Sequence, residues 1–195
     1  MLNSLNLMMG KVPGKSSTNN FVQAFSGWQL SWHGLISNQR GEWWLIAQSI
    51  LIAGHLLPAW PNPETPEFIW PDPIRYLGYS IFLLGMLLIS TSFFHLGPSL
   101  SPLPDPKPGA ALITKGAYKR CRHPLYQALE ISSFGVMLIL GSLLHLFLFI
   151  SLCCILFGKA HREEKKLRVV HPKYLSYIAQ TPAIFPHIPF FDWRS

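Results

Sequence analysis

Long apolar stretches, separated by proline-rich or charged segments, dominate the pattern along the chain. The run 43–60 has about 18 residues and 74–97 has about 24, so as helices they approach or exceed the ~30 Å of a hydrocarbon layer. The run 126–158 has about 33 residues, too many for one span, and Gly141-Ser142 offers a break. The pattern predicts an all-α integral membrane protein with about four transmembrane helices, the last two forming a tight hairpin.

Proline-rich connections separate these runs. The segments 58–73 and 98–108 contain six and five prolines, and proline removes a backbone donor and fixes φ, so both should be extended. After 158 the chain becomes charged, with a short amphipathic helix expected over 174–178. We predict an N-terminal arm over residues 1–41, either mobile or with a short surface helix around 21–35, and a membrane domain over 42–195. An organelle transit peptide is the alternative for the acid-free, Ser-rich arm.

Composition supports a membrane protein and narrows the chemistry. Hydrophobic residues make up 49% of the chain and charged residues 13%, about half the ~25% of an ordinary soluble domain. Such a composition excludes a disordered chain and argues against a soluble globular enzyme. The three cysteines form no CxxC pair, and the eight histidines form no HExxH motif. We therefore predict no metal.

Net charge is +7, from 16 Lys and Arg against 9 Asp and Glu. The basic residues lie beside the apolar runs, which indicates membrane topology rather than nucleic-acid binding. They concentrate between the second and third spans and in the tail, whereas the first loop is mainly acidic. The positive-inside bias places both termini, including the C-terminal segment, and the second loop in the cytosol.

Two charged clusters flank the predicted hairpin and should meet in space. The first, "KGAYKRCRHPLYQALE", spans 115–130, and the second, "GKAHREEKKL", spans 158–167. A hairpin brings its two ends together, so a basic, aromatic, His-bearing segment should face a pair of carboxylates. In a helix Glu163 and Glu164 point about 100° apart, which predicts different roles for them.

Each of these residue types has an ordinary structural explanation as well. Arg and His at 122–123 can be interface anchors, the tyrosines can belong to an aromatic belt, and the glutamates can form a solvated charge run. Glu130 differs, because a carboxylate one turn into an apolar run is costly and should be partnered, functional or close to the headgroups.

The two clusters and the C-terminal residues after them resemble a known family. "LITKGAYKRCRHPLY", followed by "REEKKL", "YLSY" and "TPAIFPHIP", is similar to the isoprenylcysteine carboxyl methyltransferases, which are grouped with the phospholipid N-methyltransferases of membranes. The similarity covers roughly 102–189. It implies S-adenosylmethionine as cofactor and a lipophilic acceptor that enters from the bilayer, with no metal and no nucleic acid.

The resemblance also implies roles for individual residues. It places Arg122, Lys159 and Arg162 at the reacting centre, with Lys159 near a substrate carboxylate. Ala110, Ala128 and Lys159 stand where the family commonly has His, Gly and Arg. The cofactor pocket would be formed by Leu112, Ile113, Tyr118, His123, Pro124, Leu125, Tyr126 and Glu163.

The resemblance favours methyl transfer to the carboxylate of a prenylated cysteine. That acceptor needs no base, and its charge cancels that of the sulfonium in a water-poor site. A phospholipid or other lipophilic amine is the alternative acceptor; it must first lose a proton, for which His123, Glu130 and Glu164 are candidate bases. A non-catalytic membrane protein that keeps the fold is a further alternative, and a membrane sterol reductase is disfavoured because four spans are too few.

Overall fold

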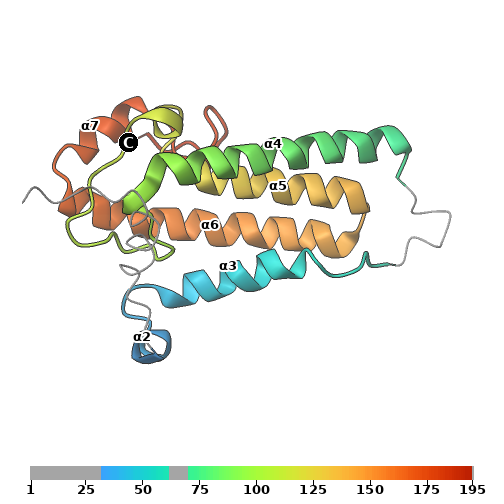
Figure 1. Cartoon of the computed structure of the whole chain (residues 1–195), viewed down its shortest axis with the longest axis horizontal. Coiled ribbons are helices and arrows are strands. Elements are labelled where there is room, and N and C mark those ends of the chain that lie inside the picture. The colour runs from blue at the N-terminus through green and yellow to red at the C-terminus, as the bar shows by residue number, and fades with distance from the viewer. Residues whose placement is uncertain (1–31, 62–69, 195) are drawn as a thin grey trace, which may run out of the picture.

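The computed structural model describes residues 32–61 and 70–194, and its regular structure is helical throughout (Figure 1). The all-α prediction is therefore confirmed for these residues. Most of the predicted arm, with most of its expected helix around 21–35, lies outside the described residues. The helices are α2 (Trp32–Ser37), α3 (Glu42–Gly54), α4 (Asp72–Leu96), α5 (Pro124–Leu140), α6 (Leu143–Val170) and α7 (Tyr174–Gln180), with short 3-10 turns η2 (Gly97–Ser99) and η3 (Gly116–Lys119).

Helices α5 and α6 form the predicted hairpin, and its turn falls at the predicted place. Gly141 ends α5 in the left-handed conformation (φ 55°), which glycine adopts without strain. A Cβ at Gly141 would lie only 1.6 Å from Cδ1 of Trp70, so the packing also requires glycine. Ser142 precedes α6, and its hydroxyl bonds both the N–H and the C=O of Trp60 (2.9 and 2.8 Å). The turn is thereby fixed to the segment that follows α3.

Helices α4 and α5 pack closely because small residues line their contact. A Cβ at Gly85 would lie 2.2 Å from Oγ of Ser132, and one at Gly135 would lie 2.6 Å from the backbone nitrogen of Phe82. Small residues let membrane helices approach closely, where dispersion rather than the hydrophobic effect favours association. The pair lies along one side of the bundle in Figure 1.

Within residues 32–61 and 70–194, two helices are long and apolar enough to cross a membrane, α4 with its extension to Ser99 and α6. Only 17% and 33% of their most apolar windows are buried, whereas a core helix of a soluble protein would be mostly covered. Their uncovered side chains are large and apolar, such as Leu83 and Leu87 on α4 and Phe147 on α6. Such surfaces suit lipid contact. Helix α5, with 17 residues, is apolar but shorter.

The predicted first span, 43–60, is wrong at its C-terminal end. Helix α3 ends at Gly54 after 13 residues, about 20 Å, which is short of the ~20 residues that a span needs. The imidazole Nδ1 of His55 lies 2.7 Å from the carbonyl of Leu51, and Pro58 follows three residues later. Proline disfavours helix in the residue before it, which stops the helix early. The described structure thus contains two candidate spans, not four.

One end of the bundle gathers the segments that the sequence singled out. The hairpin brings the start of α5 and the end of α6 to the same end, where α4 also finishes (Figure 1). The connection 97–123, helix α7 and the C-terminal residues cover that end. Helix α7 includes the amphipathic stretch predicted over 174–178.

Candidate active site

The two charged clusters meet at this end of the bundle, as the hairpin predicts. The Tyr126 hydroxyl, in the first turn of α5, donates to Oε2 of Glu163 on α6 at 2.9 Å. The Arg122 guanidinium, just before α5, donates through Nε to Oε1 of Glu164 at 2.8 Å. The contacts join segments about 40 positions apart in sequence.

The two adjacent glutamates occupy different environments. The Glu164 side chain is 3% exposed and that of Glu163 is 28% exposed. Glu164 accepts from Arg122 and from the indole N–H of Trp193 (2.9 Å), and its Oε1 lies 3.0 Å from Nε2 of His123. Glu164 is thus a buried link between three segments, while Glu163 faces a pocket. This agrees with the predicted difference between their faces.

Arg122 is bound on every side by protein groups. Besides Glu164, its Nη1 donates to the carbonyls of Thr181 and Ile178, and its Nη2 donates to the carbonyl of Trp193 at 2.7 Å. A guanidinium has five N–H donors, and these contacts with Glu164 and the tail engage all three nitrogens. Arg122 therefore anchors the C-terminal segment at the start of α5.

The backbone strengthens the same connection. The N–H groups of Arg122 and His123 donate to the carbonyls of Pro182 and Ala183 at 2.9 and 3.0 Å. The imidazole of His123 stacks on the Tyr126 ring with centroids 5.2 Å apart and planes 2° from parallel. The segment after α7 therefore holds the Arg-His-Pro residues in place, and His123 in turn orients Tyr126.

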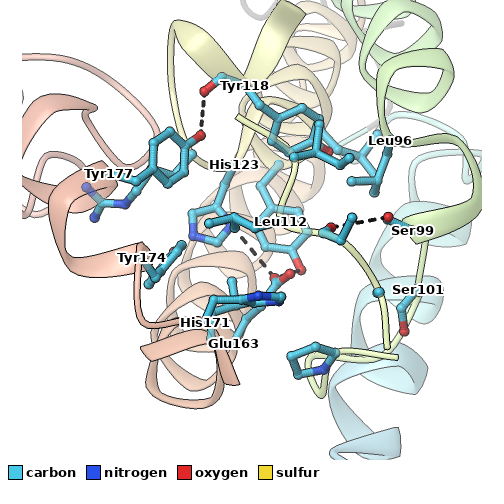
Figure 2. A pocket seen from close by; sticks show the side chains of 18 of the residues that line it. Leu96, Ser99, Ser101, Leu112, Tyr118, His123, Glu163, His171, Tyr174 and Tyr177 are labelled. Atoms are coloured by element: carbon cyan, nitrogen blue, oxygen red, sulfur yellow. Dashed lines mark hydrogen bonds and ion pairs between the residues drawn. The ribbon is translucent and has the colours of Figure 1, made fainter. Parts of the chain in front are cut away.

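A pocket opens beside these residues, between the connection 96–113, η3, α5, α6 and α7 (Figure 2). It contains about 790 Å³ of space outside protein atoms, including space open to solvent. Pro124 is buried at the first position of α5, without lining the pocket. The other predicted cofactor-binding residues all line it, together with Arg122: Leu112, Ile113, Tyr118, His123, Leu125, Tyr126 and Glu163.

The pocket wall combines phenols, a carboxylate and apolar surface. The Tyr174 hydroxyl is buried and has no hydrogen-bond partner among the described residues, so it can bond a ligand. Burial raises the pKa of Tyr174, Tyr177 and Tyr118 well above the ordinary value, which keeps all three phenols protonated. The Tyr177 hydroxyl donates to the carbonyl of Tyr118 and closes one side of the pocket (Figure 2). The wall can thus bind both polar and apolar parts of a ligand.

Two of the predicted catalytic residues lie away from this pocket. Lys159 is buried, donates through Nζ to Oε1 of Gln48 at 2.7 Å and lies 5.2 Å from the centroid of the Tyr126 ring, on α6 between α3 and α5. Arg162 contacts Asp105 through Nε at 3.4 Å. Neither side chain lines the pocket, but Lys159 contacts the ring of Tyr126, a member of the predicted cofactor-binding set. In residues 32–61 and 70–194 no three His, Cys, Asp or Glu side chains are grouped to hold a metal.

Sequence reasoning missed part of the site's support. Trp193 packs against His161 with ring centroids 4.1 Å apart and lies under the Arg122 guanidinium at 5.8 Å. Its indole also donates to Glu164. Phe190, Phe191 and Trp193, aromatic residues outside any predicted span, were the available signal.

Comparison with known families shows which family this chain belongs to. The phospholipid methyltransferase family matches residues 74–173, just over half of the chain, from α4 through α6. A comparison with curated proteins gives no significant match. The match confirms part of the resemblance, which grouped the phospholipid methyltransferases with the isoprenylcysteine carboxyl methyltransferases. The chain therefore belongs to the phospholipid methyltransferase family, membrane enzymes that methylate lipids with S-adenosylmethionine.

Proposed function

We propose that this enzyme methylates the amine headgroup of a membrane lipid, and that the pocket in Figure 2 holds its cofactor. Family membership provides the general reaction, which is S-adenosylmethionine-dependent methylation of a lipid. The proposal adds the reacting group of the acceptor and the residues that bind the cofactor. The prenylated cysteine carboxylate, favoured by the sequence resemblance, is the competing acceptor.

The pocket residues suit the chemistry of the cofactor. S-adenosylmethionine supplies a methyl group on a positively charged sulfur. Aromatic faces such as Tyr118 and Tyr126 attract a cation by about 0.5–2 kcal/mol, depending on its desolvation. The partly exposed Glu163 carboxylate can accept from ammonium or hydroxyl groups, and the unpartnered Tyr174 hydroxyl adds a further polar contact. Leu112, Ile113 and Leu125 would provide the apolar wall.

The positions of the basic side chains favour an amine over a carboxylate as the methyl acceptor. A carboxylate acceptor would be held best by a cation with free donors. Lys159 and Arg162 point to Gln48 and Asp105 outside the pocket, and Arg122 directs its guanidinium to Glu164 and the tail carbonyls. Among the described residues these are the cations that the sequence resemblance placed at the reacting centre. An amine acceptor does not need them.

The remaining residues act by holding the pocket in one arrangement. Glu164 neutralises the buried Arg122 guanidinium and fixes His123 through Nε2. His123 stacks on Tyr126, which in turn donates to Glu163. Such a chain presets the groups that contact the ligands, which lowers the entropic cost of aligning methyl donor and acceptor.

The acceptor can be identified by the chemical stability of the product. The full-length protein in phosphatidylcholine nanodiscs is given methyl-labelled S-adenosylmethionine with either phosphatidylethanolamine or N-acetyl-S-farnesylcysteine. An N-methyl group survives alkali, whereas a methyl ester releases volatile methanol. We expect alkali-stable label in the phosphatidylethanolamine fraction. Volatile label from the farnesylcysteine alone would contradict the proposal and favour the carboxylate acceptor.

A further inference from the structure

Glu130 is a buried carboxyl group for which the fold provides no partner. It lies on α5 one turn after Tyr126 and is 2% exposed, and neither of its oxygens has a hydrogen-bond partner among the described residues. Burying a polar group without a partner is costly whether the carboxyl is ionised or protonated, and more so in a membrane helix. Natural proteins leave few such groups, so this one requires an explanation.

Glu130 is among the residues that line an apolar groove separate from the cofactor pocket, and its two carboxyl oxygens are covered. The groove contains about 680 Å³ of space outside protein atoms, including open space, and Glu130 is the charged residue among its described lining. It reaches the surface of the protein, because Phe134 and Ile188 are 37% and 47% exposed. Its other walls come from α4, α6 and the tail, including Ile81, Phe149, Cys153 and Phe191.

The groove lies where a lipid chain would approach the reaction site. Two of the helices that form it, α4 and α6, are the candidate membrane spans. Residues four apart share one face of a helix, and one turn rises about 5.4 Å, so Glu130 stands one turn from Tyr126. Tyr126 lines the cofactor pocket. A headgroup at Glu130 is therefore one helical turn from that pocket's wall.

We propose that this groove binds the hydrocarbon chain of the acceptor lipid, and that the Glu130 carboxylate accepts N–H groups from its ammonium headgroup before the headgroup enters the cofactor pocket. This inference rests on the proposed amine acceptor and names the residue that selects it. An ammonium group supplies both the charge and the donors that the carboxylate lacks. A carboxylate headgroup would be repelled, so Glu130 would discriminate between the two acceptor classes.

Cys153 allows occupancy of the groove to be measured without any turnover. It lines the groove, whereas its neighbour Cys154 is exposed and would react independently. Full-length Cys154→Ser protein in phosphatidylcholine nanodiscs is treated with N-ethylmaleimide, and Cys153 modification is followed by mass spectrometry. We expect dodecylammonium to slow the reaction about tenfold, and dodecanoate of equal chain length to have much less effect, as befits a charge-assisted contact.

Two substitutions test whether the Glu130 carboxylate causes the difference in Cys153 protection between the two amphiphiles. Glu130→Gln keeps the shape of the side chain and should abolish the difference between dodecylammonium and dodecanoate. Glu163→Gln, which removes a carboxylate from the other pocket, is the matched control and should preserve the difference. Equal protection by the two amphiphiles in the parent protein, or an undiminished difference in Glu130→Gln, would overturn the inference.

Kinetics separates this inference from the proposed function. In Glu130→Gln we expect KM for phosphatidylethanolamine to rise about tenfold, with the affinity for S-adenosylmethionine unchanged. If the parent methylates phosphatidylethanolamine and Glu130→Gln matches it in KM, the Glu130 inference fails and the function stands. If the parent does not methylate the amine but Glu130 still governs Cys153 protection, the groove is a lipid-amine site and the proposed function fails.

Discussion

The indole N–H of Trp193 donates to the Oε2 of Glu164 at 2.9 Å, which joins the C-terminal tail to the C-terminal part of α6. The same carboxylate pairs with Arg122, whose guanidinium also bonds the backbone carbonyl of Trp193. Three distant parts of the chain thus depend on one buried carboxylate. The tail is consequently part of the site's framework, although it lies outside the family match at 74–173.

Replacing Trp193 with a smaller residue should weaken the contacts that support the pocket. In Trp193→Ala we expect the affinity for S-adenosylmethionine to fall several-fold and the melting temperature to drop, because Arg122 and Glu164 lose contacts with the indole. Trp193→Phe keeps a ring but removes the N–H donor and should give an intermediate loss. Both are measured by equilibrium binding and thermal unfolding in detergent. Wild-type values for Trp193→Ala would mean that the tail does not support the pocket.

Substitution of Glu164 should lower the stability of the protein far more than substitution of Glu163. Glu164→Ala leaves the Arg122 guanidinium buried without its carboxylate, and breaking a buried pair in this way costs about 3–5 kcal/mol. Glu163→Ala removes a partly exposed group and should change stability little. Denaturant unfolding of both variants tests the difference. A Glu164→Ala protein as stable as the wild type would contradict the structural assignment.

The close contact of α4 and α5 should not tolerate a side chain at Gly85. A Cβ there would meet Ser132 at 2.2 Å, and its backbone nitrogen at 2.7 Å, so the helices must separate. We expect Gly85→Val to lose about 1–3 kcal/mol of stability or to fail to accumulate. Leu84→Ala, at the half-exposed neighbouring position, is the control and should be nearly neutral. Matching melting temperatures in the two variants would show that the helices do not pack in this way.

Cys121 provides a pH-dependent measure of how firmly the Arg-His-Pro segment is held. The thiol is 2% exposed, and burial raises its pKa to about 11. Because only the thiolate reacts, iodoacetamide should modify Cys121 very slowly at pH 8 and about tenfold faster for each pH unit up to that pKa. The raised pKa favours the folded state below the thiol's ordinary pKa, and this contribution diminishes as pH rises above it. Rapid modification of the folded protein at pH 8 would indicate that the segment is open.

The helical pattern and the meeting of the two charged clusters could be predicted from sequence because their causes are local. The break at Gly141-Ser142 follows from backbone chemistry, and a hairpin necessarily brings its ends together. The early end of α3 was missed because apolar character continues to Trp60 while the helix stops before Pro58.

The support behind the site could not be predicted because tertiary contacts determine it. Nothing local distinguishes Glu164 as buried, since its surroundings on α6 are basic residues typical of a solvated face. The path of the tail is fixed by carbonyls at 178–183 that bond Arg122 and by the contacts of Trp193. Backbone carbonyls carry no sequence signal, so only the fold reveals these bonds.

The central claim is that the pocket at the start of α5 and the end of α6 binds S-adenosylmethionine. Equilibrium binding of labelled S-adenosylmethionine to the wild type, Glu163→Ala and Asp72→Ala tests it most directly, since Asp72 begins α4 and does not line the pocket. We predict saturable binding to the wild type and Asp72→Ala, with affinity at least about tenfold lower in Glu163→Ala, as expected for loss of a charge-assisted hydrogen bond. Equal affinity in all three proteins would contradict the account.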